Sequence, residues 1–384
     1  RAVPGLLPSV IKARKAGRQV IVPRDNAAEA MLARATVFAA TDLREVADHL
    51  AGRAPLQPGE AAPLTARSRR YAELLDVRGQ QSAKRALEIA AAGFHNLLLI
   101  GPPGTGKSML ARRLPGILPP MSEQEALDTA SVCSIAGAPV APGDWLGRPF
   151  RSPHHTASAA ALVGGGRTLS PGEISRAHNG VLFMDELPEF NRTVLEALRE
   201  PLETGSVRIA RAGAHADFPA RFQLVAAMNP CPCGYLGDEK SDCRCSRDRV
   251  VAYRNKVSGP LLDRIDLHVE VLRPSTAVLR DGEPGAECTA AVARRVAQAR
   301  QIGAERSGIP NALLEGDALA ETCPLDDKCW ALLETAADRF NLSARAHQRV
   351  LRVARTIADL AARKKIAPPH VAEALSLRCL DRRV

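Results

Sequence analysis

The fold of this chain is decided by the stretch Leu97-Leu-Leu-Ile100-Gly101-Pro-Pro-Gly104-Thr-Gly106-Lys107-Ser108. An apolar run is followed by glycines, by a Lys-Ser pair and then by the helix-like segment Met109–Leu114. The pattern G-x-x-x-x-G-K-S between a strand and a helix is typical of a loop whose backbone N–H groups bind phosphate oxygens. The alternative is an ordinary glycine turn between a strand and a helix.

This loop predicts a binding site for ATP and Mg²⁺. The Lys107 ammonium is expected to reach the β- and γ-phosphates, and the Ser108 hydroxyl is expected to hold the metal. The residues predicted to bind the nucleotide are Gly101, Pro102, Pro103, Gly104, Thr105, Gly106, Lys107, Ser108 and Met109.

The composition is that of a globular protein with a basic charge balance. The chain has 384 residues, enough for two or three domains, and its net charge is +10. The charge favours a polyanionic partner, whereas aromatic residues, at 3%, are too sparse for extensive base stacking. No apolar run is long enough for a membrane span, and Arg1–Val10 lacks the layout of a signal peptide. We therefore expect a cytoplasmic protein with no membrane partner, whose nine cysteines are thiols or metal ligands.

Two further apolar runs end in polar residues that suit ATP hydrolysis. Val181–Met184 is followed by Asp185 and Glu186. Asp185 is predicted to bind Mg²⁺ through water, and Glu186 to polarise the attacking water. Gln223–Met228 is followed by Asn229, which is predicted to orient that water. The alternative is an Asn that merely ends a strand before a proline.

Five further motifs give the chain a resemblance to a known family. They are Arg148-Pro-Phe-Arg-Ser-Pro-His154-His155-Thr, Leu162-Val-Gly-Gly-Gly166, Pro171-Gly-Glu-Ile174, Ala177-His-Asn-Gly180-Val and Asp185-Glu-Leu-Pro-Glu-Phe190. Residues 71–274 resemble the magnesium-chelatase-type AAA+ ATPases, and nearly the whole chain is similar to the ComM/YifB family within that group. The resemblance implies a homo-hexameric, ATP-driven DNA motor, a helicase that promotes branch migration during natural transformation.

The resemblance also implies an α/β fold with three parts. A P-loop AAA+ core with a parallel sheet spans residues 67–274, and a helical lid similar to the magnesium-chelatase C-terminal domain spans residues 275–384. Residues 1–53 are similar to the C-terminal part of a Lon-protease-like domain, and residues 54–66, rich in proline, are expected to be a linker. Leu7 stands in the place of the catalytic lysine of active Lon proteases, so this part is expected to be inactive. The chain starts at Arg1 rather than Met, which predicts that the Lon-like part is truncated.

Local sequence patterns predict the elements of the two outer parts. Ser343 is expected to cap a helix of the lid.

The segment Tyr71–Gln80 precedes a helix and, by the resemblance, lies over the adenine; the alternative is an ordinary loop. The predicted helices are Val10–Ala16, Asn26–Ala33, Leu43–Leu50, Ser82–Ala92, Ala286–Ser307, Asp326–Phe340, Ser343–Ala362 and Pro369–Ser376, and the predicted outer strands are Gln19–Pro23 and Thr36–Ala39.

Two arginines are expected, from the resemblance, to act on the γ-phosphate. Arg264 precedes an apolar strand, in the place of the arginine that enters the neighbouring subunit's site in AAA+ rings. The alternative is a local surface pair with Asp263 or Asp266. Arg345 lies in Leu342–Leu351, which is similar to the second sensor segment. It would meet the phosphate in its own subunit or across the subunit boundary.

Two segments are predicted to contact DNA. Ser206–Arg221 alternates in polarity and turns at Gly213, which predicts a hairpin, and related AAA+ proteins insert a pore hairpin here. Arg148–Arg167 corresponds to an insertion in the second helix of that group. Basic residues there would hold phosphates without reading bases, and the candidates are Arg208, Arg211, Arg151 and Arg167. The alternatives are a structural hairpin with a solvated basic edge and, for the pair His154-His155, a plain loop.

Four cysteines gather within fifteen residues, at Cys231, Cys233, Cys243 and Cys245. Four thiolates in two pairs match a closed tetrahedral Zn²⁺ site, although each pair is spaced C-x-C rather than the commoner C-x₂-C. A structural Zn²⁺ beside the active site is therefore predicted. The alternatives are free thiols in a flexible loop and a redox pair.

Three other functions compete with a DNA motor. The first is a magnesium-chelatase motor subunit that remodels a protein partner or drives metal insertion. The Lon-like part argues against it, since such subunits lack that part. The second is a scaffold that uses ATP only to assemble, which the Asp185-Glu186 pair disfavours. The third is an ATP-dependent protease, which Leu7 disfavours.

Overall fold

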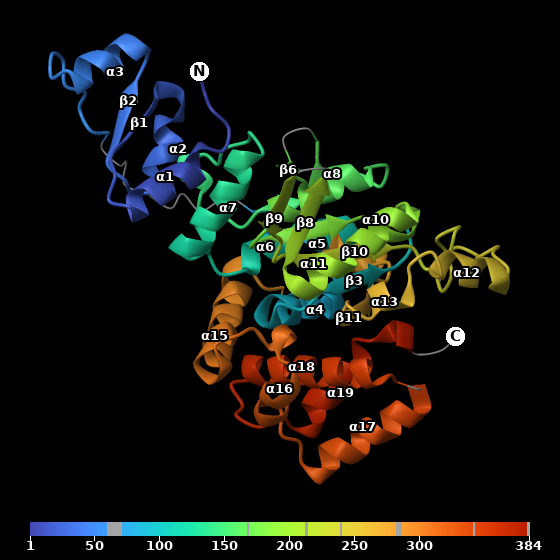
Figure 1. Cartoon of the computed structure of the whole chain (residues 1–384). Coiled ribbons are helices and arrows are strands. Elements are labelled where there is room, and N and C mark those ends of the chain that lie inside the picture. The colour runs from blue at the N-terminus through green and yellow to red at the C-terminus, as the bar shows by residue number, and fades with distance from the viewer. Residues whose placement is uncertain are drawn as a thin grey trace.

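The computed structural model describes residues 1–59, 71–166, 169–211, 214–238, 240–281, 286–340 and 342–381. Figure 1 shows a small N-terminal α/β unit at one end, a central sheet covered by helices, and a helical C-terminal unit below it in the view. The predicted DNA contact Arg167 and residues 60–66 of the predicted linker lie outside the described residues.

A five-stranded parallel sheet forms the centre of the molecule, which confirms the predicted fold class. Its three inner strands are buried on both faces and consist almost wholly of apolar residues, as is typical of a parallel sheet with helices on both sides. Because parallel strands end at the same edge, the residues that follow the inner strands meet there. The strand order is β11 (Leu267–Glu270), β3 (Leu97–Ile100), β10 (Gln223–Met228), β7 (Val181–Met184) and β4 (Phe150–Arg151).

Side chains of the inner strands alternate between two cores, one on each face of the sheet. Leu97 and Leu99 face the core that holds α4 (Gln81–Gly93), α15 (Thr289–Ser307) and α18 (Ala344–Leu360). Leu98 and Ile100 face the core that holds α10 (Arg192–Ala197) and the hairpin of β8 (Ser206–Arg211) and β9 (Ala214–Pro219). The predicted hairpin is thus confirmed, and it packs on the sheet face opposite to the C-terminal helices.

The C-terminal unit is helical, as predicted. It contains α15, α16 (Gly316–Thr322), α17 (Asp327–Phe340), α18 and α19 (Pro368–Ser376). The four predicted helices are present with ends shifted by a few residues, whereas α16 was not predicted. The Ser343 hydroxyl accepts the Ala346 N–H at 3.2 Å, so Ser343 caps α18.

The N-terminal unit pairs β1 (Val20–Pro23) with β2 (Val37–Ala40) in parallel and adds α1 (Leu6–Lys15), α2 (Ala27–Met31) and α3 (Leu43–Leu50). Helix α1 begins earlier than predicted, and the helix predicted at Asn26–Ala33 is reduced to α2 after a short 3₁₀ turn.

The N-terminal unit packs on α7 (Glu123–Ile135) of the central part. The Gly5 N–H donates to the Ser134 carbonyl at 2.9 Å. Leu7 is fully buried in a core shared with Leu127 and Trp145. Leu7 therefore forms an apolar contact between the N-terminal unit and the central part.

Short helices and strands complete the central part. They are α5 (Lys107–Ala111), α6 (Leu114–Ile117), α8 (Ala159–Val163), β5 (Gly164–Gly165), β6 (Ser170–Pro171), α9 (Glu173–Arg176), α11 (Arg199–Thr204), α12 (Arg247–Arg254), α13 (Gly259–Leu262) and α14 (Thr276–Asp281). Among the residues that the structure describes, no helix combines the length and the apolar character that crossing a bilayer requires.

Candidate active site

The glycine-rich loop joins the end of β3 to the start of α5. Gly104 and Gly106 adopt φ values of 76° and 90°, which favour glycine and let the chain curl around its own backbone N–H groups. The Lys107 side chain lies within this curl. Its Nζ donates to the carbonyls of Gly101 and Pro102 at 2.6 and 2.9 Å. The loop therefore has the shape of a phosphate cradle with its lysine at the centre.

Lys107 is a buried cation next to two carboxylates. Burial lowers its pKa to about 8, against the opposite effect of the Asp185 and Glu186 charges. The same ammonium lies 3.2 Å from Oδ1 of Asn229. A desolvated ammonium whose partners are neutral oxygens is well suited to exchange them for the charged oxygens of a polyphosphate.

Asp185 meets the Ser108 hydroxyl across the edge of the sheet. The hydroxyl donates to Oδ2 of Asp185 at 2.6 Å. A hydroxyl and a carboxylate this close provide two oxygen ligands of the kind that Mg²⁺ prefers, with room left for water and phosphate. The structure thus brings together the two predicted metal ligands, which are separated by 77 positions in the sequence.

Glu186, the predicted base, begins a 3₁₀ turn with φ at 54°, an uncommon value for a residue other than glycine. Its Oε2 atom lies 3.1 Å from Nδ1 of the His155 ring. From the sequence His155 was expected to lie in a plain loop, and its contact with Glu186 was not predicted. The only signal was its place shortly after β4, at the same edge of the sheet.

Asn229 follows β10, the strand between β3 and β7, so it lies between the loop and the Asp185-Glu186 pair. Gln80, at the end of the segment predicted to cover the adenine, donates from Nε2 to the Thr105 carbonyl at 3.1 Å. The residues predicted for the nucleotide therefore converge on one edge of the sheet, and their donor set fits ATP with Mg²⁺.

The two arginines predicted to act on the γ-phosphate, Arg264 and Arg345, lie elsewhere, at the opposite edge of the sheet. The backbone carbonyl of Arg264 accepts from Nδ2 of Asn96, which directly precedes β3. Its guanidinium donates to the Pro260 carbonyl and to Oε2 of Glu203, both at 2.7 Å. The local partner proposed from the sequence, Asp263 or Asp266, is thus replaced by Glu203 from α11.

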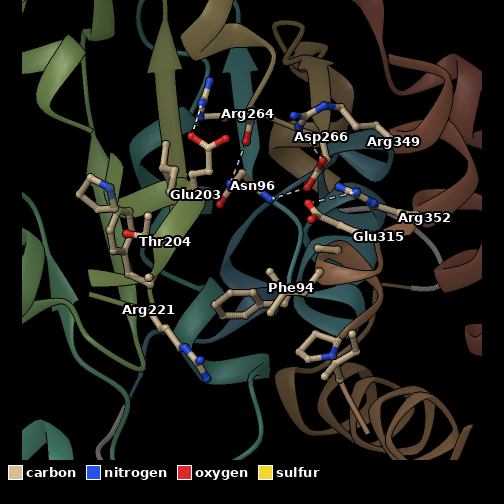
Figure 2. A pocket seen from close by; sticks show the side chains of 18 of the residues that line it. Phe94, Asn96, Glu203, Thr204, Arg221, Arg264, Asp266, Glu315, Arg349 and Arg352 are labelled. Atoms are coloured by element: carbon tan, nitrogen blue, oxygen red, sulfur yellow. Dashed lines mark hydrogen bonds and ion pairs between the residues drawn. The ribbon is translucent and has the colours of Figure 1, made fainter. Parts of the chain in front are cut away.

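Arg264 and Arg345 line the same cavity, which has a volume of about 540 Å³. Figure 2 shows Glu203 and Arg264 together on one wall, and Asp266, Arg349, Glu315 and Arg352 on the other. The lining includes five arginines, which are Arg221, Arg264, Arg345, Arg349 and Arg352. The lining also includes the acidic residues Glu203, Asp263, Asp266 and Glu315, so Arg264, Arg349 and Arg352 each have a carboxylate partner.

Asp266 lines the wall of this cavity that also carries Arg349. It is 4% exposed and is bonded by Nδ1 of His95 at 3.2 Å and by Nη1 of Arg349 at 2.9 Å. Burial alone would raise the pKa of Asp266, but the bonds and charges of these two partners outweigh it and hold the pKa well below its usual range. Arg349 is therefore neutralised within the protein, whereas Arg264 is held by an exposed carboxylate.

The arginines predicted to contact DNA differ in how exposed their side chains are. Arg208 is exposed on β8 and pairs with Asp217 on β9 at 2.8 Å. Arg151 instead donates two bonds to the carboxylate of Glu173, at 2.6 and 2.7 Å. Its guanidinium thus already has an anionic partner. Arg211 is the last residue of β8.

The four cysteines of the predicted metal site lie together. Their Sγ atoms all fall within 4.8 Å of one another, and Cys231 lies 3.3 Å from Cys233 and 3.6 Å from Cys243. Sulfurs about 2.3 Å from one tetrahedral zinc ion would lie roughly 3.8 Å apart, so the donor set fits Zn²⁺. Backbone hydrogen bonds at Tyr235 and Arg244 lower the pKa of Cys233 to about 6. A backbone hydrogen bond also acts to lower the pKa of Cys243 and of Cys245, but burial and the sulfurs of Cys233 and Cys231 outweigh it, so the pKa of each is instead raised.

This cysteine loop contacts the phosphate cradle. At Gly234 φ is 88°, and an added Cβ would lie only 2.8 Å from Cδ of Pro103. The close approach requires glycine there. The cysteine loop thus packs directly against the phosphate loop at Pro103.

Fold and site together define a class of protein. A parallel sheet whose inner strands carry a phosphate loop, an Asp-Glu pair and a polar residue between them is that of a P-loop ATPase of the AAA+ type. Comparison with known families agrees. Residues 73–279 match "Magnesium chelatase, subunit ChlI", and residues 286–378 match its C-terminal region.

Two individual proteins are similar over the whole chain, and a third is similar over part of it. Competence protein ComM of Haemophilus influenzae is 48% identical over 390 residues, covering 100% of this chain and 76% of that protein. Protein YifB of Salmonella typhimurium is 47% identical, covering 100% of this chain and 75% of that protein. The magnesium-chelatase 38 kDa subunit of Rhodobacter capsulatus is 29% identical over 243 residues, covering 58% of this chain and 61% of that subunit.

The chain therefore belongs to the ComM/YifB family of magnesium-chelatase-type AAA+ ATPases. Membership in this family implies ATP and Mg²⁺ as ligands.

Proposed function

We propose that this protein is an ATP-hydrolysing AAA+ motor that works as a hexameric ring on DNA, as a helicase that drives branch migration. One observation carries the proposal. The phosphate loop, the metal ligands and the base lie at one edge of the sheet, while Arg264 and Arg345 line a cavity at the other edge. A single chain thus carries two halves of a phosphate site that face apart.

The separation of these halves favours a head-to-tail assembly. The four residues of β3 span roughly 13 Å between Asn96 and the start of the loop, and Arg264 is bonded at the Asn96 end. Its guanidinium is directed to Glu203 rather than to its own loop. When two complementary surfaces at opposite edges of the sheet bind head to tail, copies related by rotation close into a ring. Arg264 and Arg345 of one copy then contact the nucleotide bound by the next copy.

The proposed chemistry assigns one task to each residue. Lys107 exchanges its carbonyl partners for phosphate oxygens, and Asn229 orients the attacking water. Glu186 takes the proton from that water as it attacks. Mg²⁺, held through Ser108 and Asp185, would neutralise charge on the phosphate oxygens. Arg264 of the neighbouring copy stabilises the charge that develops on the transferred phosphoryl group.

DNA as the substrate is supported by three observations. The net charge is +10, the exposed Arg208 stands on the β8–β9 hairpin, and a protein 48% identical over the full chain is named for competence. An exposed arginine on a hairpin suits contacts to the phosphate backbone, which carry no base information. We therefore propose backbone contacts that do not depend on sequence.

A chelatase-like role is the second candidate. It is favoured by the match of residues 73–279 to the magnesium chelatase subunit family. In that case the motor would act on a protein partner or drive metal insertion into a porphyrin. Residues 1–59, which pack on α7, lie outside both matched regions and favour the first candidate.

The deciding experiment is steady-state ATP hydrolysis with no DNA and with single-stranded, duplex or forked DNA, at two salt concentrations. A DNA motor predicts strong stimulation that weakens at the higher salt, because phosphate contacts release counterions. Hydrolysis that none of the three DNAs stimulates contradicts DNA as the substrate and favours the chelatase-like role. Arg208→Ala should reduce the stimulation, whereas Arg44→Ala, which removes an exposed arginine from α3 of the N-terminal unit, should not.

We also propose that Cys231, Cys233, Cys243 and Cys245 hold one structural Zn²⁺. The proposal is supported by the grouping of their sulfurs and by the contact of Gly234 with Pro103. A closed four-thiolate site has no open position for chemistry. The ion would instead fix the loop that lies against the phosphate cradle.

A further inference from the structure

Glu203 connects the arginine cavity to the base of the hairpin. Its Oε2 accepts the Nη2–H of Arg264 at 2.7 Å. That bond, and then the charges of Arg264 and Arg345, keep the pKa of Glu203 below its ordinary value. The Glu203 side chain is 67% exposed and that of Arg264 14%, so the carboxylate is the freer partner of the pair.

The chain from Glu203 into the hairpin is held by hydrogen bonds. Glu203 is the penultimate residue of α11, and β8 starts at Ser206. The Ser206 N–H donates to the Thr204 hydroxyl at 3.3 Å. The Gly205 N–H donates to the Pro201 carbonyl, and the Gly205 carbonyl accepts the Ala220 N–H just past β9 at 2.8 Å. A displacement at the end of α11 would therefore reach both strands of the hairpin.

We propose that Glu203 is the positioning residue through which the nucleotide of a neighbouring subunit changes the position of the β8–β9 hairpin. The inference rests on the proposed ring, in which the neighbour's γ-phosphate lies against Arg264. A phosphate and the Glu203 carboxylate then compete for one guanidinium, and the two anions repel each other. The Arg264–Glu203 pair is weak because its carboxylate is exposed, so the phosphate displaces it.

The competition makes hairpin position depend on nucleotide state. With ATP at the neighbour, Glu203 leaves Arg264 and the end of α11 is released. Once the γ-phosphate has gone, the pair re-forms and α11 returns with the hairpin. Coupling of this kind is reciprocal, so a ligand that holds the hairpin also alters the neighbour's affinity for ATP. This coupling would convert ATP hydrolysis into movement of the ligand that the hairpin binds.

The test is hydrogen–deuterium exchange of the amides in β8 and β9, measured on the full chain with a slowly hydrolysed ATP analogue and with ADP. The variant is Glu203→Gln, and the matched control is Glu200→Gln, which removes another exposed carboxylate from the same helix. The wild-type chain and the control should show different exchange in the two nucleotide states. Glu203→Gln should show the same exchange in both, while the nucleotide still protects its own phosphate loop.

The possible outcomes distinguish failure of this inference from failure of the proposed ring. A nucleotide-dependent difference that persists in Glu203→Gln overturns the inference, and so does a wild-type ring that shows no difference. A wild-type chain that stays monomeric with nucleotide, by light scattering, contradicts the ring and the inference with it. Glu203→Gln should bind a fluorescent ATP analogue more tightly than the wild-type chain and the Glu200→Gln control, because Arg264 then has no competing carboxylate. Equal affinity in all three proteins would contradict the competition.

Discussion

The Nδ1 atom of His155 lies 3.1 Å from the Oε2 atom of Glu186. His155 comes from the segment after β4, and Glu186 from the turn after β7, the neighbouring strand in the sheet. One carboxylate oxygen is thus held by an imidazole, which leaves the other to accept a proton from water. This contact orients the proposed base before any substrate arrives.

His155→Ala is therefore expected to lower kcat for ATP hydrolysis by no more than about 5-fold, because a contact between two partly exposed polar side chains contributes about 0.2–1 kcal/mol. KM for ATP should stay unchanged, because His155 contacts the base and not the phosphate loop. The control is His154→Ala, since His154 bonds to Thr156 rather than to Glu186. An increase in kcat for His155→Ala would instead mean that the contact restrains the base.

The position of the arginine cavity predicts complementation between two inactive variants. Glu186→Gln should bind ATP and hydrolyse it at least about 100-fold more slowly, because it lacks the general base. Arg264→Ala should also bind ATP and lose turnover, by on the order of 10³-fold if its role matches that of an arginine finger. Neither variant alone should show appreciable steady-state hydrolysis.

Mixing the two variants should restore hydrolysis. In a random mixture about a quarter of the head-to-tail interfaces would combine an intact Glu186 with an intact Arg264 from the next copy. The measurement is ATP turnover against mixing ratio, with exchange of subunits checked by a mass tag on one variant. Mixed rings without recovered turnover would show that Arg264 does not act across the boundary.

The nucleotide site could be predicted from the sequence because each of its parts is local. The loop, the Asp185-Glu186 pair and Asn229 each follow an apolar run, and parallel strands bring such positions to one edge. The order of strands was not needed, since any arrangement with these strands in the middle gives the same cluster.

The contacts that were missed are pairs between distant segments. Glu203 and Arg264 are 61 positions apart, and their meeting depends on how α11 lies against α13, which hydrophobic periodicity does not encode. Arg151 was predicted to contact DNA, and its two bonds to Glu173, 22 positions later, were not predicted. Helix α16 was missed because its seven residues are too few to show a clear period.

The cysteine cluster predicts a metal content of one zinc ion per chain. Elemental analysis of purified protein should find it, and Cys243→Ser should lose most of it. Cys288→Ser is the control, because Cys288 lies outside the cluster, before α15. Zinc that remains in Cys243→Ser at the level of the control would contradict the assignment.

Removal of this metal should also weaken nucleotide binding. The Gly234 backbone lies against Pro103, so a loosened cysteine loop withdraws packing from the phosphate cradle. After treatment with a strong chelator, the affinity for a fluorescent ATP analogue in the absence of Mg²⁺ should fall several-fold and recover when Zn²⁺ is returned. Equal affinity before and after chelation would show that the loop and the cradle are independent.

The buried His178 predicts a loss of stability in mild acid. Its ring is 6% exposed, and Nδ1 accepts the Arg221 N–H at 3.0 Å, where the chain leaves the hairpin for β10. Burial lowers the pKa of His178 from 6.5 to about 4, with a smaller lowering from Arg221 and opposing effects from Asp128 and Glu125. At a pH between about 4 and 6.5, the His178 ring is therefore neutral in the folded protein and protonated in the unfolded chain.

The sign of the pH dependence follows from this difference. Between about pH 6.5 and pH 4 the unfolded chain binds the extra proton, so the stability of the fold decreases as the pH falls, by up to about 1.4 kcal/mol per pH unit from this residue. His178→Asn keeps an acceptor for the Arg221 N–H but cannot be protonated, so its free energy of unfolding should fall less steeply over the same range. Urea unfolding at pH 7, 6, 5 and 4.5 measures how the free energy of unfolding changes with pH in the wild-type chain and in His178→Asn. Other acidic groups titrate alike in the two proteins. Equal pH dependence in both would therefore contradict the role of His178.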